Sequence, residues 1–327
     1  MPLVLVEQTG GTPSDPSLQT LTLARSFGGP VHALVIGQAV DLSQHGVAAT
    51  HVAVHDGLDS FAPDAWAAIL GQLSDRLSAN AIFAAGTDRG NDVMARVAAR
   101  MGLPLATNCI SVASGDQIHL TRQRWGGSLL EEARMRSPRP LITVAPHTVV
   151  IETASAETKV EKFTPQLKEQ ELAVRVAERV STKGGGVSLA EAKVVVSGGR
   201  GVGSKEGFAI IEELAGLLGG AVGCSRVVTS AGWRPHSDQV GQTGTKIAPE
   251  LYIVCGISGA TQHMAGCKGA KRILAINSDA EAPIMLNADY AVVGDLKEIV
   301  PAISAEIRAA RAAHAPLPNP LPGGERG

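Results

Sequence analysis

The feature that most constrains the fold is a repeated alternation of short apolar runs with longer amphipathic stretches. Short continuous apolar runs are typical of buried strands in a parallel sheet, and apolar residues at helical spacing indicate amphipathic helices. The first half is expected to form helices over residues 64–77 and 92–101. Its expected strands are residues 4–6, 33–36, 51–54, 81–84 and 141–144. This alternation predicts a doubly wound α/β domain with a mostly parallel sheet.

The alternation restarts near residue 193, after a segment of different composition. Residues 152–191 are rich in Glu, Lys, Thr and Arg, and the run Lys183-Gly-Gly-Gly186 is a linker signal. Beyond it we expect a helix over 205–218. The expected strands of this half are residues 193–197, 226–229, 251–255, 272–276 and 290–293.

The predicted organisation is therefore two doubly wound parallel-sheet α/β domains joined by a linker. Residues 1–186 would form the N-terminal domain with the linker, and residues 187–314 would form the C-terminal domain. Residues 315–327 are rich in Pro and Gly, so we expect a disordered tail without function.

Composition and charge exclude several classes of function. Apolar residues make up 44% of the chain and the net charge is -2, so nothing favours nucleic acid or an anionic membrane as partner. No apolar run approaches the ~20 residues that cross a bilayer, and no signal or transit peptide is evident. The four cysteines are scattered without a Cys-x-x-Cys pair, so we expect no metal site, no disulfides and a reduced cytoplasmic protein.

Two glycine-rich loops carry most of the functional signal. They are Gln239-Val-Gly-Gln-Thr-Gly244 and Ile257-Ser-Gly-Ala-Thr-Gln-His263. Glycine allows close approach of backbone to a ligand, and the neighbouring amides, hydroxyls and imidazole supply hydrogen bonds without net charge. This combination favours a polar cofactor rich in hydrogen-bonding groups. In the second loop Ser258 is expected to cap a helix that carries His263 in its first turns.

Further candidates lie at strand boundaries, where ligands bind in open parallel sheets. The loop Ser197-Gly-Gly-Arg-Gly-Val-Gly-Ser-Lys205 fits neither the dinucleotide fingerprint nor a Walker A loop. A tight turn and an anion-binding loop are about equally compatible with it, and Arg200 favours the anion. Ser225 and Arg226 are expected to open a strand. Asn277 and Asp295 follow two later strands.

In combination these motifs resemble the α subunit of electron transfer flavoprotein. The resemblance covers nearly all of residues 193–303 and looser features of the first half, including Arg124-Trp-Gly-Gly-Ser128. It is carried by the loop at 197–201 and the two glycine-rich loops, together with Ala248-Pro-Glu-Leu-Tyr-Ile, Ala275-Ile-Asn and Ala282-Pro-Ile.

The resemblance implies an electron carrier rather than an enzyme. It implies a heterodimer with a β subunit and one FAD held mainly by the C-terminal domain. Flavoprotein dehydrogenases, such as those of fatty acid β-oxidation, would donate electrons, and a quinone reductase would accept them. By similarity, Thr243, Arg226 and His263 would tune the flavin, with Thr243 at N5 and His263 near the C2 carbonyl. A positive or donating His263 would stabilise added negative charge on the ring.

The remaining residues would bind other parts of the cofactor. Gln242, Ser258 and Gln262 would serve the ribityl and pyrophosphate part, and Arg200, Asn277, Asp295 and Leu296 the adenosine end. The full set of expected FAD-binding residues is Arg200, Ser225, Arg226, Gln239, Val240, Gly241, Gln242, Thr243, Ser258, Gly259, Ala260, Thr261, Gln262, His263, Asn277, Asp295 and Leu296.

Three departures leave the subtype open. Residues 233–238 carry more charge and bulk than common members, Thr245 separates Gly244 from Lys246, and Thr261 replaces the commoner Ile. A housekeeping, a nitrogen-fixation-linked and an electron-bifurcating type remain alternatives. Two rivals from other classes are a nicotinamide-dependent dehydrogenase, which lacks its fingerprint and an acid–base pair here, and a non-redox nucleotide sensor.

Overall fold

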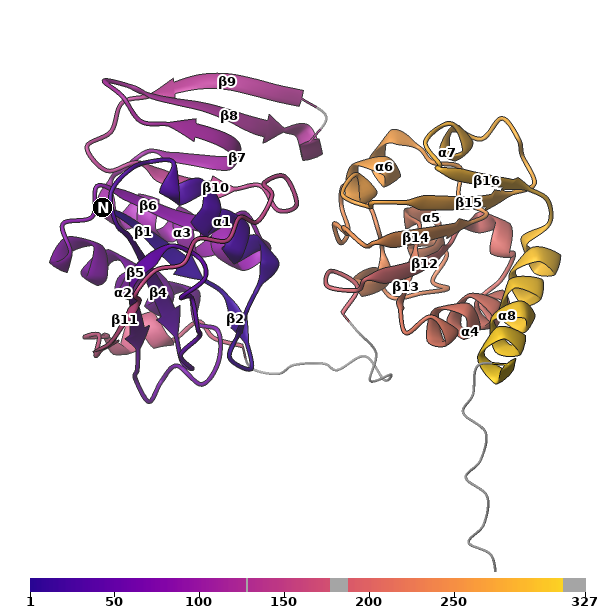
Figure 1. Cartoon of the computed structure of the whole chain (residues 1–327), viewed down its shortest axis with the longest axis horizontal. Helices are drawn as coiled ribbons and strands as arrows, with labels where there is room; N and C mark the ends of the chain where they lie inside the picture. Colours follow the sequence, from indigo (N-terminus) through magenta and orange to yellow (C-terminus); the bar gives the residue numbers. More distant parts are fainter. Residues whose placement is uncertain (128, 177–187, 314–327) are drawn as a thin grey trace, which may run out of the picture. The chain divides into compact units, whose positions relative to one another are not determined.

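The computed structural model describes residues 1–127, 129–176 and 188–313, and the chain divides into two compact units (Figure 1). The units are Met1–Ser181 and Thr182–Gly327. Each is built on a largely or wholly parallel sheet, which confirms the predicted fold class. The glycine run at 183–186 and the predicted tail at 315–327 lie outside the described residues.

The first unit contains a nine-stranded sheet, which is parallel except at one edge. In spatial order its strands are β11 (Lys159–Phe163), β5 (Val47–Ala53), β4 (Val31–Ile36), β1 (Pro2–Val6), β6 (Ala81–Ala85), β10 (Leu141–Val144), β7 (Leu105–Ala113), β8 (Ile118–Arg124) and β9 (Leu129–Met135). A small hairpin, β2 (Gln8–Thr9) and β3 (Thr12–Pro13), stands apart from it.

The central strands of this sheet were predicted, whereas the outer strands were not. Strands β7, β8 and β9 form antiparallel pairs, and β9 exposes most of its residues. Strand β11 is an edge strand with the sequence Lys-Val-Glu-Lys-Phe, of which only Phe163 is buried. Edge and half-exposed strands lack the continuous apolar run that marks a buried parallel strand. Part of the polar segment at 152–191 thus pairs with β5 in the first unit.

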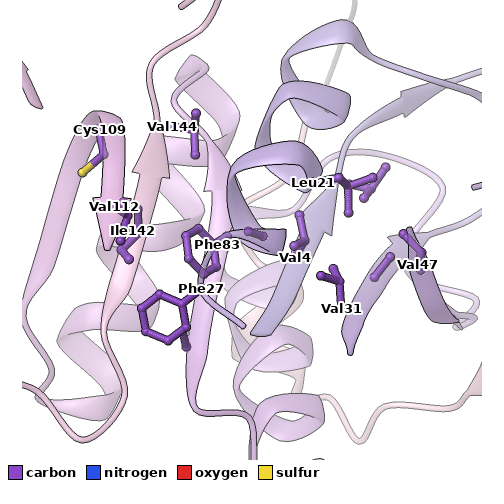
Figure 2. Packing of buried hydrophobic residues seen from close by; sticks show 14 of the residues in the cluster. Val4, Leu21, Phe27, Val31, Val47, Phe83, Cys109, Val112, Ile142 and Val144 are labelled. Atoms are coloured by element: carbon purple, nitrogen blue, oxygen red, sulfur yellow. The ribbon is translucent and has the colours of Figure 1, made fainter. Parts of the chain in front are cut away.

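Helices cover both faces of this sheet. Helix α1 (Asp15–Arg25) packs on one face, where Leu21 joins Val4, Phe83 and Ile142 in an apolar cluster (Figure 2). Helices α2 (Pro63–Arg76) and α3 (Asp88–Met101) pack on the other face. Helix α3 begins earlier than predicted because the Thr87 hydroxyl caps it by accepting from the Gly90 amide at 2.9 Å.

The second unit is a five-stranded parallel sheet in the order β13 (Ala221–Cys224), β12 (Val194–Gly198), β14 (Leu251–Cys255), β15 (Ile273–Asn277) and β16 (Tyr290–Val293). Helices α6 (Thr261–Cys267) and α7 (Pro283–Leu286) pack on one face. Helices α4 (Ala209–Leu217), α5 (Arg226–Ser230) and α8 (Leu296–Ala313) pack on the other. None of the helices in the described residues is long and apolar enough to span a membrane.

The strand order places a switch point between β12 and β14, because the chain runs from β12 to one side of the sheet and then to the other. At such a point the loops that leave two neighbouring strands diverge and open a crevice outside their carboxyl ends. A ligand is therefore expected beyond Gly198 and Cys255.

The predicted strand at 226–229 is wrong. The residues form helix α5, and the second strand of the unit is β13, which ends just before Ser225. Two β-branched valines favoured a strand at this position, whereas β13 contains Gly223, which weakens its strand signal. Gly223 is needed there because a Cβ would lie 2.3 Å from the Ser197 hydroxyl on β12.

Candidate functional site

A cavity of about 490 Å³ lies at the carboxyl ends of the strands of the second unit. Its walls come from the loops that follow β12, β13, β14 and β15, together with the first turn of α6. The lining residues are Arg200, Gly201, Ser225, Arg226, Val227, Gln239, Val240, Gly241, Gln242, Thr243, Gly256, Ile257, Ser258, Ala260, Gln262, His263, Asn277, Asp279 and Ala282. Its size falls in the range of small-molecule sites.

The loop after β12 packs tightly against the loop after β14. A Cβ on Gly199 would lie 2.2 Å from the carbonyl oxygen of Gly256, and the Gly201 amide donates to that same oxygen at 3.1 Å. The Gly199 amide donates to the carbonyl of Cys255 at 2.8 Å. These two glycines therefore serve the packing of neighbouring loops, and their amides are already used within the protein.

Two arginines supply positive charge at the cavity wall. Arg200 and Arg226 are exposed, and within the described part of the chain neither guanidinium has a hydrogen bond or an ion pair. A guanidinium offers five donors that match phosphate and carbonyl oxygens. The wall is therefore suited to a ligand that carries anionic or oxygen-rich groups.

The glutamine-rich loop is held against α6 through glycines. A Cβ on Gly266 of α6 would lie 2.3 Å from the Gly241 amide nitrogen, so no other residue permits this contact. The Gln242 amide donates to the carbonyl of Gln262 at 2.7 Å, and the Ile247 amide donates to the carbonyl of Gly266 at 2.8 Å. The two motifs that stood out in the sequence thus form one wall of the cavity.

The expected role of Ser258 as a helix cap is wrong. Helix α6 begins at Thr261, and Ala260 occupies the cap position. Ser258 belongs to an earlier turn, where Gly259 has φ +80° and packs against the backbone of Ile284. The Ser258 carbonyl accepts from the Ile284 amide at 3.0 Å. Its side chain remains exposed on the cavity wall.

His263 lies in the first turn of α6 and is buried. The Tyr252 hydroxyl lies 2.8 Å from its Nε2. Burial lowers the pKa of His263 to about 4, against a weaker raising influence of the Val240 backbone, so the ring is neutral at pH 7. Burial also raises the pKa of Tyr252 far above its usual value, so the phenol keeps its proton.

The pairing with Tyr252 is compatible with either neutral tautomer of the ring. A phenol hydroxyl both donates and accepts, so Nε2 either accepts from Tyr252 or donates to it. Within the described residues Nδ1 is buried without a hydrogen bond of normal geometry, although the Val240 backbone lies near enough to the ring to raise its pKa. Of the two forms considered from the sequence, a positive and a donating His263, the low pKa argues against the positive one at pH 7.

Asn277 and Asp295 hold turns in place. The Asn277 amide donates to the carbonyl of Ile257 at 3.0 Å, and its oxygen accepts from the Asp279 amide. The Asp295 carboxylate accepts from the Lys297 amide at 2.9 Å at the start of α8. Asn277 reaches the cavity wall and Asp295 does not.

The cavity brings together most of the residues singled out from the sequence. Those that do not line it are Gly259, Thr261, Asp295 and Leu296. The lining residues that sequence reasoning missed are Gly201, Val227, Gly256, Ile257, Asp279 and Ala282. Gly256 and Asp279 come directly or shortly after a strand, and that position is the signal that could have found them.

This fold with this site defines a nucleotide-cofactor-binding protein, since an open α/β sheet places a cavity with two exposed arginines at its switch point. Two family models identify the cofactor class. Residues 188–268 match the electron transfer flavoprotein FAD-binding domain, and residues 2–168 match the electron transfer flavoprotein domain. The chain belongs to the electron transfer flavoprotein α-subunit family, as its motifs indicated.

Curated relatives support the same assignment over the whole chain. Protein FixB of Clostridium saccharobutylicum is 38% identical over 93% of this chain and 95% of that protein. The electron transfer flavoprotein subunit alpha of Clostridium acetobutylicum is 36% identical, over 94% of this chain and 96% of its own length. That of Mycobacterium leprae is 38% identical, over 94% and 98% respectively.

FAD is the cofactor of the C-terminal domain. The residues present fit it, because the cavity offers the buried ring of His263, two guanidiniums that are exposed and unpaired among the described residues, and glycines that let two loops approach closely. Bound FAD supplies one- and two-electron redox chemistry, and the protein contributes binding, orientation and electrostatics.

Proposed function

We propose that the chain is the FAD-binding subunit of a heterodimeric electron carrier that works with a β subunit in the bacterial cytoplasm. It receives electrons from flavoprotein dehydrogenases, including those of fatty acid β-oxidation, and delivers them to a quinone reductase or another acceptor. Relatives named as α subunits support the heterodimer. The observation that carries the proposal is the switch-point cavity, where both glycine-rich loops meet beside the buried ring of His263.

Thr243, Arg226 and His263 are proposed to face the flavin ring. All three line the cavity from different elements, and together they do not form an acid–base or nucleophilic pair. Preorganised donors stabilise negative charge that develops on a cofactor, and they need no rearrangement when it arrives. A buried, neutral His263 suits this role, and the exposed guanidinium of Arg226 adds positive charge at the same wall. The proposal needs no general base.

The other lining residues are proposed to hold the rest of the cofactor. Gln242, Ser258 and Gln262 are exposed on the wall between the two motifs, where a chain of ribityl hydroxyls can be bound. Arg200 stands at the loop after β12 and suits a phosphate. Asp295 and Leu296 do not line the cavity, and we propose no direct contact for them.

An absorption spectrum of the chain co-purified with a candidate β subunit tests this function. One FAD per heterodimer, reduced in separate one-electron steps during stepwise addition of dithionite, is the expected result. Two flavins per heterodimer would instead favour an electron-bifurcating type. A colourless heterodimer that FAD does not reconstitute would refute the proposal.

A further inference from the structure

Three side chains form a hydrogen-bonded chain that runs from α5 to the cavity. The Thr229 hydroxyl lies 2.7 Å from Oε1 of Gln239 and 2.9 Å from the carbonyl oxygen of Arg226, so its one proton is shared between two acceptors. Nε2 of Gln239 lies 3.0 Å from the hydroxyl of Thr243. Gln239 is only 2% exposed. Thr229 does not line the cavity, whereas Thr243 lines it and is exposed.

The amide of Gln239 gives this chain a direction. Its oxygen faces Thr229 and can only accept, and its nitrogen faces Thr243 and can only donate. Thr243 therefore accepts at Oγ1 and keeps its own proton for another partner. Because the side chain lines the cavity, that proton is available to a ligand.

Both ends of the Gln239 side chain are thus occupied within the protein. Its backbone is engaged as well, since its amide donates to the carbonyl of His236 at 3.0 Å and its carbonyl accepts from the Thr245 amide at 2.7 Å. A Cβ on Gly244 would lie 2.2 Å from that carbonyl oxygen, so the loop closes tightly around Gln239. Gln239 is therefore built into the loop through both its side chain and its backbone.

We propose that Gln239, supported by Thr229, is a positioning residue that makes Thr243 a hydrogen-bond donor toward the flavin. The inference rests on the proposed function as an FAD-dependent electron carrier. A donor fixed in advance stabilises the reduced flavin more than the oxidised one, because reduction adds electron density to the ring. If the Thr243 hydroxyl no longer donates toward the flavin, the potential of the first one-electron step is therefore lowered.

A double-mutant cycle on the FAD-loaded heterodimer tests the coupling. Gln239→Met keeps the length of the side chain and removes its hydrogen bonds, and Thr243→Val removes the hydroxyl. Each is expected to lower the equilibrium constant of the first reduction about tenfold, which is about 59 mV for a one-electron couple. The equilibrium constant of the double variant should be no lower than that of Thr243→Val alone. Potentials are measured against reference dyes during stepwise reduction.

Reversing the polarity at position 239 gives a sharper variant. Gln239→Glu offers only acceptors, so the Thr243 proton turns back toward position 239. We expect the potential of the first reduction step to fall further than in Gln239→Met. In the Thr243→Val background, the difference in potential between Gln239→Glu and Gln239→Met measures the added charge alone. It should be smaller than the same difference measured with Thr243 present.

Position 229 tests the outer end of the chain without touching the cavity. Thr229→Val removes the hydroxyl at nearly constant shape and should lower the equilibrium constant about threefold, while Thr229→Ser should restore it. The FAD dissociation constant and the unfolding midpoint are measured for every variant. A structural role alone would move these two quantities and leave the potential unchanged.

The outcomes separate this inference from the function on which it rests. If the wild-type heterodimer binds no FAD, the proposed function fails. If all variants bind FAD and the shift caused by Gln239→Met is the same with Thr243 or Val at position 243, the positioning role fails and the carrier function stands. Coupled shifts with rescue by Thr229→Ser are the supporting result.

Discussion

At the scale of single residues, burial decides the chemistry of this site more than formal charge does. His263 is neutral at pH 7 because its ring is desolvated, and its partner Tyr252 is fully buried behind it. The charged groups that line the cavity are therefore arginines and an aspartate, and His263 contributes a neutral ring. One supporting side chain, Gln239, sets the direction in which the Thr243 hydroxyl donates.

His263→Gln is expected to reduce the acid sensitivity of the second unit. Burial lowers the pKa of His263 from 6.5 to about 4, so the unfolded chain takes up a proton between these values and the folded chain does not. Stability present above pH 6.5 is therefore lost as the pH falls, by about 2 kcal/mol at pH 5. His263→Gln should not show this part of the loss of stability, because glutamine does not titrate.

Urea unfolding at pH 7.5 and pH 5 measures this difference. Trp66→Phe and Trp125→Phe in both proteins leave Trp233 as the reporter of the second unit. The buried histidines of the first unit stay the same in both proteins. Equal losses of stability in the two proteins would contradict the depressed pKa.

Tyr252→Phe is expected to destabilise the second unit by about 1–3 kcal/mol, because it leaves the buried Nε2 of His263 without a partner. Tyr290→Phe is the matched control, since Tyr290 is 55% exposed and is the only other tyrosine. Urea unfolding midpoints are compared for the two variants. A control that loses as much stability as Tyr252→Phe would argue against the buried hydrogen bond.

At the scale of elements, close approach between loops determines where glycine is required. Helix α6 reaches the glutamine-rich loop only because Gly266 and Gly241 both lack a side chain. The loop after β12 meets the end of β14 in the same manner at Gly199. The glycines of these motifs thus position the cavity walls, and the polar residues between them supply the contacts.

Gly266→Ala and Gly216→Ala place the same change in two helices with opposite expected results. At Gly266 the new Cβ would lie 2.3 Å from the Gly241 nitrogen, so the variant should lose about 1–3 kcal/mol of stability and retain less FAD. At Gly216 in α4 no atom lies within 4 Å, so alanine should add about 0.5–1 kcal/mol. Urea unfolding and flavin absorbance after desalting measure both effects. Similar results at both sites would contradict the close contact.

At the scale of the whole molecule, the two units have separate cores. The apolar clusters of the first unit draw their buried residues from Leu3 to Phe163, and those of the second from Ala192 to Val300. Each cluster lies on one face of its own sheet. Folding of either unit therefore depends on its own buried surface.

A fragment of residues 188–313 is expected to unfold cooperatively, with a thermal midpoint close to that of the second unit in the full chain. The physical reason is the pair of apolar clusters on the two faces of its sheet. Circular dichroism melting measures the midpoint, and a fragment of residues 1–176 serves as the parallel case. A fragment without a cooperative transition would show that the clusters are insufficient alone.

The sequence by itself determined the α/β class, the two sheets, the family and the loops that form the cavity. These follow from local patterns, namely apolar runs, helical spacing, and glycine with polar residues just beyond strands. Features with weak local patterns were missed, including the half-exposed β9 and the edge strand β11. The segment 226–229 was misread because valine favours strands and the strand before it contains glycine.

Only the tertiary structure decided which atoms face the cavity and which support others. Gln239 and Thr243 stand together in one motif, yet the Gln239 side chain also bonds Thr229 on α5. His263 is neutral because its ring is buried, and Tyr252 from β14 reaches its Nε2. Proton positions and pKa values depend on burial and on partners from distant elements, which no local pattern encodes.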